Sequence, residues 1–295
     1  MRGREDQRRA RVTSVGRNAA WVVFDDEIEP RLAALRKTAD RGALVPGDLV
    51  IARPIDDGRV LVERREPRAF ELARTTAGGR RKVMAANVDT LAVVAAFDNP
   101  PPHLEMIDEL LAFAELHELA GTLILTKPDL VATAVAETLV AIYRGLGYPV
   151  LVVNPKSRTG IDAVTAQLDR RHALLIGQSG VGKSSLYGAL GGTAKVGALS
   201  KIGRGRQTTT AARLHRFPAG FMIDSPGVAE FALRAINPAE LADAFVEFRP
   251  LVRSCRFSDC VHRSEPDCAI RTAVADGRIA ASRYASYCAI LGRPA

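Results

Sequence analysis

The chain has 295 residues, of which 47% are hydrophobic and 25% charged, with a formal net charge of +8, as is ordinary for a globular protein of two or three domains. No apolar run has transmembrane length and the charged N-terminus lacks a signal peptide's apolar segment, so we expect a cytoplasmic protein outside membranes. The basic excess favours nucleic acid over an anionic membrane surface as partner, although a solvated basic surface fits the charge equally well.

The first 67 residues combine a basic arm with short apolar runs separated by turn signals. We expect the arm, Arg2–Arg11, to be mobile because it is rich in charge. Strands are predicted over 20–24, 48–52 and 59–63. Several short strands in so short a stretch predict a small β-barrel of the OB type, which would contact nucleic acid through arginines. The alternative is a purely structural β-module.

Strands and helices alternate in the next stretch, which predicts an α/β parallel sheet. Strands are expected over 87–97, 121–125 and 149–153, with helices over 104–119 and around 135–142.

The tetrapeptide Thr126-Lys127-Pro128-Asp129 directly follows one of these strands and has the form of the guanine-reading motif [N/T]-K-x-D. Its carboxylate would accept hydrogen bonds from the N1–H and 2-amino groups of guanine, a donor pair that adenine lacks. The lysine stem would pack against the base and the phosphate loop. Alone the motif is weak and would fit a surface turn, but it becomes specific beside a phosphate loop in the same sheet.

A P-loop follows the apolar strand predicted over 172–176 and precedes a predicted helix. The glycines would let backbone N–H groups surround phosphate oxygens, Lys183 would reach the β- and γ-phosphates, and the Ser184 hydroxyl would hold Mg²⁺. The alternative, a chance glycine-rich turn, is disfavoured by the order of strand, loop and helix. The predicted phosphate-binding residues are Gly177, Gln178, Ser179, Gly180, Val181, Gly182, Lys183, Ser184 and Ser185.

The order of these motifs is unusual, because in common GTPases the P-loop precedes the base-reading motif. Here the base-reading motif comes first, so the chain is a circular permutation of the usual order. The loop 154–162 occupies the place of the last guanine-contacting loop. Pro155 has no backbone N–H to offer the guanine O6 there.

The segment after the P-loop carries the candidate switches. One of Thr208, Thr209 and Thr210 would bind Mg²⁺ and sense the γ-phosphate, although a threonine run also suits a plain β-strand. Asp224, in a D-x-x-G motif that ends in Gly227, would hold Mg²⁺ through water. Val228 stands where many GTPases have the glutamine that orients the attacking water, which predicts slow intrinsic hydrolysis.

The C-terminal segment predicts a helix that begins at Asn237 and a closed metal site of three thiolates and one imidazole. Zinc is the expected metal, with a structural role, because four candidate ligands fall within 14 positions: Cys255, Cys260, His262 and Cys268. Cys288 is expected to be a plain buried thiol on a helix. The basic surroundings, together with Arg283 and Tyr284, favour a nucleic-acid contact.

These motifs together resemble the ribosome small-subunit-dependent GTPase family RsgA over nearly the whole chain. The resemblance implies an OB-fold barrel with its basic arm over 1–67, a circularly permuted P-loop GTPase domain over 68–232 and a helical zinc domain over 233–295. It implies GTP, Mg²⁺ and one zinc ion as cofactors. It also implies binding to 16S rRNA of the 30S subunit, late subunit maturation, and GTP hydrolysis stimulated by that subunit.

The resemblance also suggests where catalysis lies. Catalytic roles fall on Lys183, Thr209 and Gln207, the last standing where the family usually has histidine. An amide can orient water but cannot accept its proton near neutral pH, so either Gln207 orients the water or that role is lost. Two other classes remain open: an ATPase or nucleotide kinase, and an RNA-binding module with a vestigial nucleotide site. A monomer is expected.

Overall fold

The structure is a computed structural model that describes residues 7–16, 20–27, 29–35, 44–55, 58–75, 81–192, 213–217, 220–224 and 236–293. It divides into two compact units. The first comprises Met1–Asp89, Thr165–Leu175 and Ser184–Val228, and the second comprises Thr90–Val164, Ile176–Lys183 and Ala229–Ala295. No helix within the described ranges is long and apolar enough to cross a bilayer.

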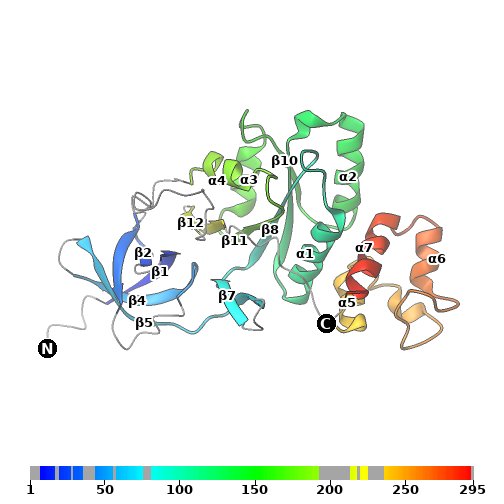
Figure 1. Cartoon of the computed structure of the whole chain (residues 1–295), viewed down its shortest axis with the longest axis horizontal. Helices are drawn as coiled ribbons and strands as arrows, with labels where there is room; N and C mark the ends of the chain where they lie inside the picture. Colours follow the sequence, from blue (N-terminus) through cyan, green and yellow to red (C-terminus); the bar gives the residue numbers. More distant parts are fainter. Residues whose placement is uncertain are drawn as a thin grey trace. The chain divides into compact units, whose positions relative to one another are not determined.

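The N-terminal part of the first unit is a closed five-stranded barrel (Figure 1). The strand order is β1-β2-β3-β5-β4, with β3 and β5 parallel and the other pairs antiparallel. Alternating side chains, including Val12, Val22 and Phe24, fill its core. The predicted OB-type barrel is therefore confirmed. The strands are β1 (Arg8–Val15), β2 (Ala20–Phe24), β3 (Arg31–Leu35), β4 (Leu49–Pro54) and β5 (Val60–Arg65).

Strand β1 corrects the expectation of a mobile arm over Arg2–Arg11, because it begins at Arg8. Ala10 and Val12 are fully buried on either side of Arg11, which is the alternation of a strand with one face in the core. The Arg11 guanidinium lies 4.3 Å from the centre of the Phe221 ring and donates to the Gly47 carbonyl at 3.0 Å. Burial lowers the pKa of Arg11 to about 10.

A two-stranded hairpin follows the barrel, formed by β6 (Glu71–Thr75) and β7 (Arg81–Ala86). A buried ion pair attaches the segment before β6 to the start of β4: Arg68 donates to both oxygens of the Asp48 carboxylate, at 2.6 and 2.9 Å. Asp48 also accepts from the Val45 N–H.

The central sheet has six strands in the order β10-β9-β8-β11-β13-β12. Strands β8, β9 and β10 pair in parallel, as do β11 and β13, whereas β12 pairs antiparallel with β13. Every residue of β8 is buried, as the unbroken apolar run predicted. The strands are β8 (Thr90–Ala96), β9 (Ala120–Thr126), β10 (Val150–Val153), β11 (His172–Ile176), β12 (Arg213–Arg216) and β13 (Phe221–Asp224); the helices are α1 (Leu104–Leu116), α2 (Thr133–Gly145), α3 (Ile161–Leu168) and α4 (Lys183–Ala189).

Three helices close the described chain: α5 (Pro238–Ala244), α6 (Ala269–Ala275) and α7 (Ala281–Leu291) (Figure 1). Asn237 caps α5 as predicted, since its side chain accepts from the Ala239 N–H at 2.8 Å. The apolar face of that segment, Leu241, Phe245 and Phe248, is fully buried in one core with Tyr287.

Acidic residues of α1 are paired with arginines of this C-terminal segment, all within the second unit. Arg283 donates at 2.7 Å to Asp108 and at 2.7 Å to Glu247, and its side chain is 1% exposed. Burial opposes the charge of Arg283, but the two carboxylates outweigh it and raise its pKa. Two further arginines make similar contacts: Arg293 with Glu105 and Glu109, and Arg249 with Glu115.

This arrangement corrects one sequence-based expectation. The sequence favours a nucleic-acid contact at Arg283 and Tyr284, but the buried Arg283 side chain is paired with the carboxylates of Asp108 and Glu247. The Tyr284 hydroxyl donates to the His262 carbonyl at 2.8 Å. Both side chains therefore hold the C-terminal segment together.

Candidate nucleotide and metal sites

The P-loop begins where β11 ends, and the position of its first glycine is set by a close backbone approach. Gly177 has a φ of +155°, and a Cβ atom there would lie 2.0 Å from the Val94 carbonyl oxygen of β8. No side chain fits that gap, so the strand-to-loop turn requires glycine. The predicted sequence of strand, loop and helix is confirmed, with α4 beginning at Lys183.

The Lys183 ammonium lies within the loop, where it donates to the carbonyls of Gly177 and Gln178, both at 2.7 Å. A flexible cation enclosed by glycine-rich backbone is the donor set that phosphate oxygens require. Ser184 directly follows Lys183 in the first turn of α4, so the predicted Mg²⁺-binding hydroxyl adjoins the loop in the sequence. The P-loop residues therefore fit a nucleoside triphosphate with Mg²⁺.

The tetrapeptide 126–129 contacts the P-loop directly, within the second unit. The buried Thr126 hydroxyl lies 2.5 Å from the Val181 carbonyl and 3.2 Å from the Ala95 carbonyl. Lys127 adopts φ +56° and donates to the Gly180 carbonyl at 2.8 Å and to the Asn99 carbonyl. The motif and the loop thus form one structural element, as expected if they hold the same ligand.

Asp129 has a partner that the sequence pattern did not reveal. The Asn154 side-chain amide donates to the Asp129 carboxylate at 2.8 Å, and its oxygen accepts from the Lys156 N–H at 3.0 Å. One asparagine therefore connects the base-reading carboxylate to the loop that begins at 154. The sequence signal for this contact is that Asn154 directly follows β10, the strand that pairs in parallel with β9, after which Asp129 comes.

The predicted switch residues are described only in part. Asp224 ends β13, the strand parallel to β11. The other predicted residues lie outside the described residues: Gln207, Thr208, Thr209, Thr210, Gly227 and Val228. Their roles remain predictions.

The four predicted metal ligands meet in one cluster in the C-terminal segment. The Cys255 and Cys268 sulfurs are 4.0 Å apart, and each lies 3.5 Å from His262 Nδ1. Zinc–ligand bonds of about 2.3 Å to sulfur and about 2.0 Å to nitrogen predict S···S and S···N edges of about 3.8 and about 3.5 Å in a tetrahedral site. The cluster, including Cys260, therefore fits tetrahedral zinc.

The loop that carries the ligands is fixed by its own hydrogen bonds. The Tyr287 hydroxyl donates to the Val261 carbonyl at 3.0 Å. Glu265 accepts from the N–H groups of Val261, Arg263 and Ser264. Burial alone would raise the pKa of Glu265, but these N–H groups outweigh it and lower the pKa to about 2. Cys288 lies on α7 outside the cluster, as predicted, but its side chain is half-buried rather than buried.

A P-loop that follows a TKxD motif within one six-stranded sheet, with a barrel before and a Cys₃His cluster after, defines a circularly permuted GTPase. The family model described as RsgA GTPase matches residues 65–234, so the chain belongs to the RsgA GTPase family and is a GTP-hydrolysing enzyme. GTP and Mg²⁺ use follow from that membership.

Named relatives and solved structures agree with this assignment. A small ribosomal subunit biogenesis GTPase RsgA of Ectopseudomonas mendocina is 43% identical over 86% of this chain and 76% of its own. The RsgA of Azotobacter vinelandii is 42% identical over 90% and 80%. The crystal structure of YjeQ from Thermotoga maritima matches with TM-score 0.75 and 32% identity over 97% of this chain and 99% of that one. YloQ, a circularly permuted GTPase, shares the fold with TM-score 0.73 at 23% identity, over 99% and 96%.

Proposed function

We propose that this GTPase is an assembly factor that binds 16S rRNA of the 30S ribosomal subunit, promotes its late maturation and is stimulated by it. The observation that carries the nucleotide part is the contact of Lys127 with the Gly180 carbonyl, which unites base-reading motif and P-loop. The printed names of the relatives, small ribosomal subunit biogenesis GTPases, support the ribosomal part.

Within this proposal each element of the nucleotide site has one role. Asp129 selects guanine, positioned by Asn154, while the P-loop residues 177–185 bind the phosphates. Ser184, a switch threonine and Asp224 hold Mg²⁺, the last through water. Lys183 stabilises charge that develops on the transferred phosphoryl group. Gln207 orients the attacking water, and Thr209 completes the switch.

An OB-fold domain over 1–67, a GTPase domain over 68–232 and a zinc domain over 233–295 make up a cytoplasmic monomer. The Cys₃His cluster holds one structural zinc ion, supported by its tetrahedral spacings. The barrel and the zinc domain both contact rRNA, consistent with the net charge of +8.

The test of guanine selection is Asp129→Asn. An amide cannot accept both guanine donors, so GTP affinity should fall by at least about tenfold, with preference shifting to xanthosine triphosphate. Nucleotide titration of the full chain measures both affinities. Unchanged GTP binding in this variant would contradict the assignment. Co-sedimentation of the wild type with 30S subunits, with a non-hydrolysable GTP analogue present, tests the partner separately.

A further inference from the structure

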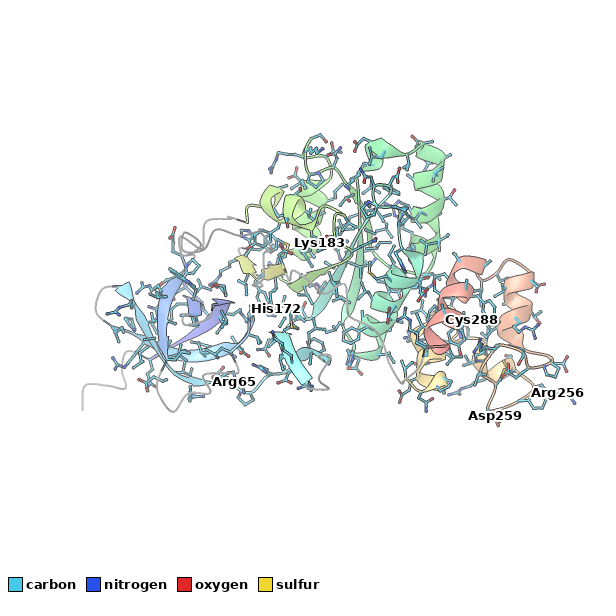
Figure 2. All side chains as sticks on the ribbon, in the orientation of Figure 1. Arg65, His172, Lys183, Arg256, Asp259 and Cys288 are labelled. Carbon is cyan, nitrogen blue, oxygen red and sulfur yellow. The ribbon has the colours of Figure 1, made fainter. Side chains whose placement is uncertain are left out.

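The loop that follows β10 offers few hydrogen-bond donors to the base of a bound nucleotide. It begins at Asn154 and returns at Thr159, whose carbonyl accepts from the Asn154 N–H at 3.0 Å. The loop lies in the second unit together with Asp129 and with the P-loop lysine, Lys183 (Figure 2). Loop, base-reading carboxylate and P-loop therefore belong to one proposed nucleotide site.

Each backbone N–H at the start of this loop is either engaged or missing. Asn154 donates its own N–H to Thr159, and Pro155 has none. The N–H groups of Lys156 and Ser157 both donate to the side-chain oxygen of Asn154, at 3.0 and 3.4 Å. All four positions are thereby accounted for, so none of them has a donor left for a base.

Further contacts hold the loop in this arrangement. The Ser157 hydroxyl lies 2.9 Å from the Thr159 hydroxyl. Gly160 has a φ of +76°, and a Cβ atom there would lie 2.3 Å from the Val152 carbonyl oxygen of β10. This close approach requires glycine and ties the end of the loop to the strand before it. Freeing an N–H group for a ligand would therefore break hydrogen bonds that the loop already makes.

The base-reading carboxylate, by contrast, is accessible and held in place. Asp129 lies on η2 (Pro128–Leu130), is exposed, and accepts from the Asn154 side-chain amide at 2.8 Å. A carboxylate has about four acceptor sites, so this amide leaves room for the two adjacent donors of guanine, N1–H and the 2-amino group.

We infer that Pro155 and Asn154 determine which edge of guanine is read: Asp129 binds the N1–H and 2-amino edge, whereas O6 receives no hydrogen bond from this loop. A backbone N–H facing position 6 would favour the O6 acceptor of guanine and oppose the 6-amino donor of adenine. Without it, the exclusion of adenine depends on Asp129. The inference deepens the proposed function, since it rests on the guanine selection assigned there to Asp129.

The site should therefore accept a purine nucleotide that keeps N1–H and the 2-amino group but carries sulfur at position 6. The test is equilibrium titration of the full-length chain with the diphosphates of guanosine, 6-thioguanosine and inosine, which avoid turnover during the measurement. Wild-type affinity for the 6-thio nucleotide should lie within about twofold of that for GDP, because no N–H is lost to the poorer sulfur acceptor. Inosine diphosphate lacks the 2-amino group and should bind at least about tenfold more weakly, because a hydrogen bond to a charged carboxylate is lost.

Pro155→Ala supplies the missing N–H. It should raise affinity for GDP but not for the 6-thio nucleotide, so that GDP is preferred about three- to tenfold. Lys156→Ala is the matched control, because it truncates the neighbouring side chain and keeps the N–H bond to Asn154. Its preference between the two nucleotides should equal that of the wild type. Thermal unfolding checks that both variants fold.

Wild-type binding of GDP more than about threefold tighter than the 6-thio nucleotide would show that another donor reads O6 and would overturn the inference. A preference in Pro155→Ala equal to that of the wild type would refute the role of Pro155. Equal wild-type affinities for ADP and GDP are a separate failure, because they would remove the guanine selection of the proposed function itself.

Discussion

At the residue scale, Gly177 sets the entry to the P-loop. A Cβ atom at this position would lie 2.0 Å from a backbone carbonyl of β8, which cannot yield as a side chain can. We expect Gly177→Ala to lower GTP affinity at least about tenfold and to destabilise the fold by about 1–3 kcal/mol. Nucleotide titration and denaturant unfolding measure these effects.

Gly188 offers the matched control, because it lies within α4 and a Cβ atom added there would meet nothing within 4 Å. Gly188→Ala should leave GTP binding unchanged and raise stability by up to about 1 kcal/mol, since alanine favours helix. Equal behaviour of the two alanine variants would contradict the role assigned to the close approach at Gly177.

Asn154 is the residue-scale feature that reasoning from motifs missed. Its amide holds the Asp129 carboxylate, so Asn154→Ala should lower GTP affinity about five- to tenfold and leave weak ATP binding unchanged. Ser157→Ala is the control, because that hydroxyl contacts the Thr159 hydroxyl at 2.9 Å and the Asn154 backbone carbonyl at 3.5 Å, and neither contact involves the Asn154 side-chain amide. An equal loss of GTP and ATP binding in Asn154→Ala would indicate general damage to the loop instead.

At the element scale, α1 and α7 are joined by the buried contact of Arg283 with Asp108 and Glu247. Arg283→Met leaves two carboxylates without their cation, and breaking a buried pair in this way costs about 3–5 kcal/mol. Denaturant unfolding of the full chain should show that loss. Arg278→Met, which breaks a pair with Asp276 that is 55% exposed on both sides, should cost under about 1 kcal/mol. A comparable loss in both variants would contradict the assignment.

The sequence predicts elements with a strong hydrophobic pattern, but it does not predict the contacts between elements. The buried strands β8 and β11 were recognisable because unbroken apolar runs suit a parallel sheet. Strand β1 is not predicted, because arginines surround its inward-facing Ala10 and give the segment the composition of a charged arm. The pairing of Arg283 with Asp108 joins residues 175 positions apart, and nothing local in either sequence signals it.

At the scale of the whole molecule, the proposed zinc ion organises the segment from Cys255 to Cys268. We expect one zinc ion per wild-type chain, and none in Cys268→Ser, whose C-terminal segment should lose its cooperative unfolding transition. Cys288→Ser should retain zinc, because that thiol lies outside the cluster. Elemental analysis with thermal unfolding makes the comparison, and full zinc content in Cys268→Ser would refute the assigned ligand set.

The proposed assembly role is tested most directly by GTP turnover of the full chain with and without purified 30S subunits, for the wild type and Gln207→His. We predict slow turnover alone and strong stimulation by 30S subunits in the wild type. Stimulation confined to Gln207→His would mean that the natural glutamine does not support stimulated hydrolysis. Absence of stimulation in both proteins would contradict the assignment of this GTPase to the small ribosomal subunit.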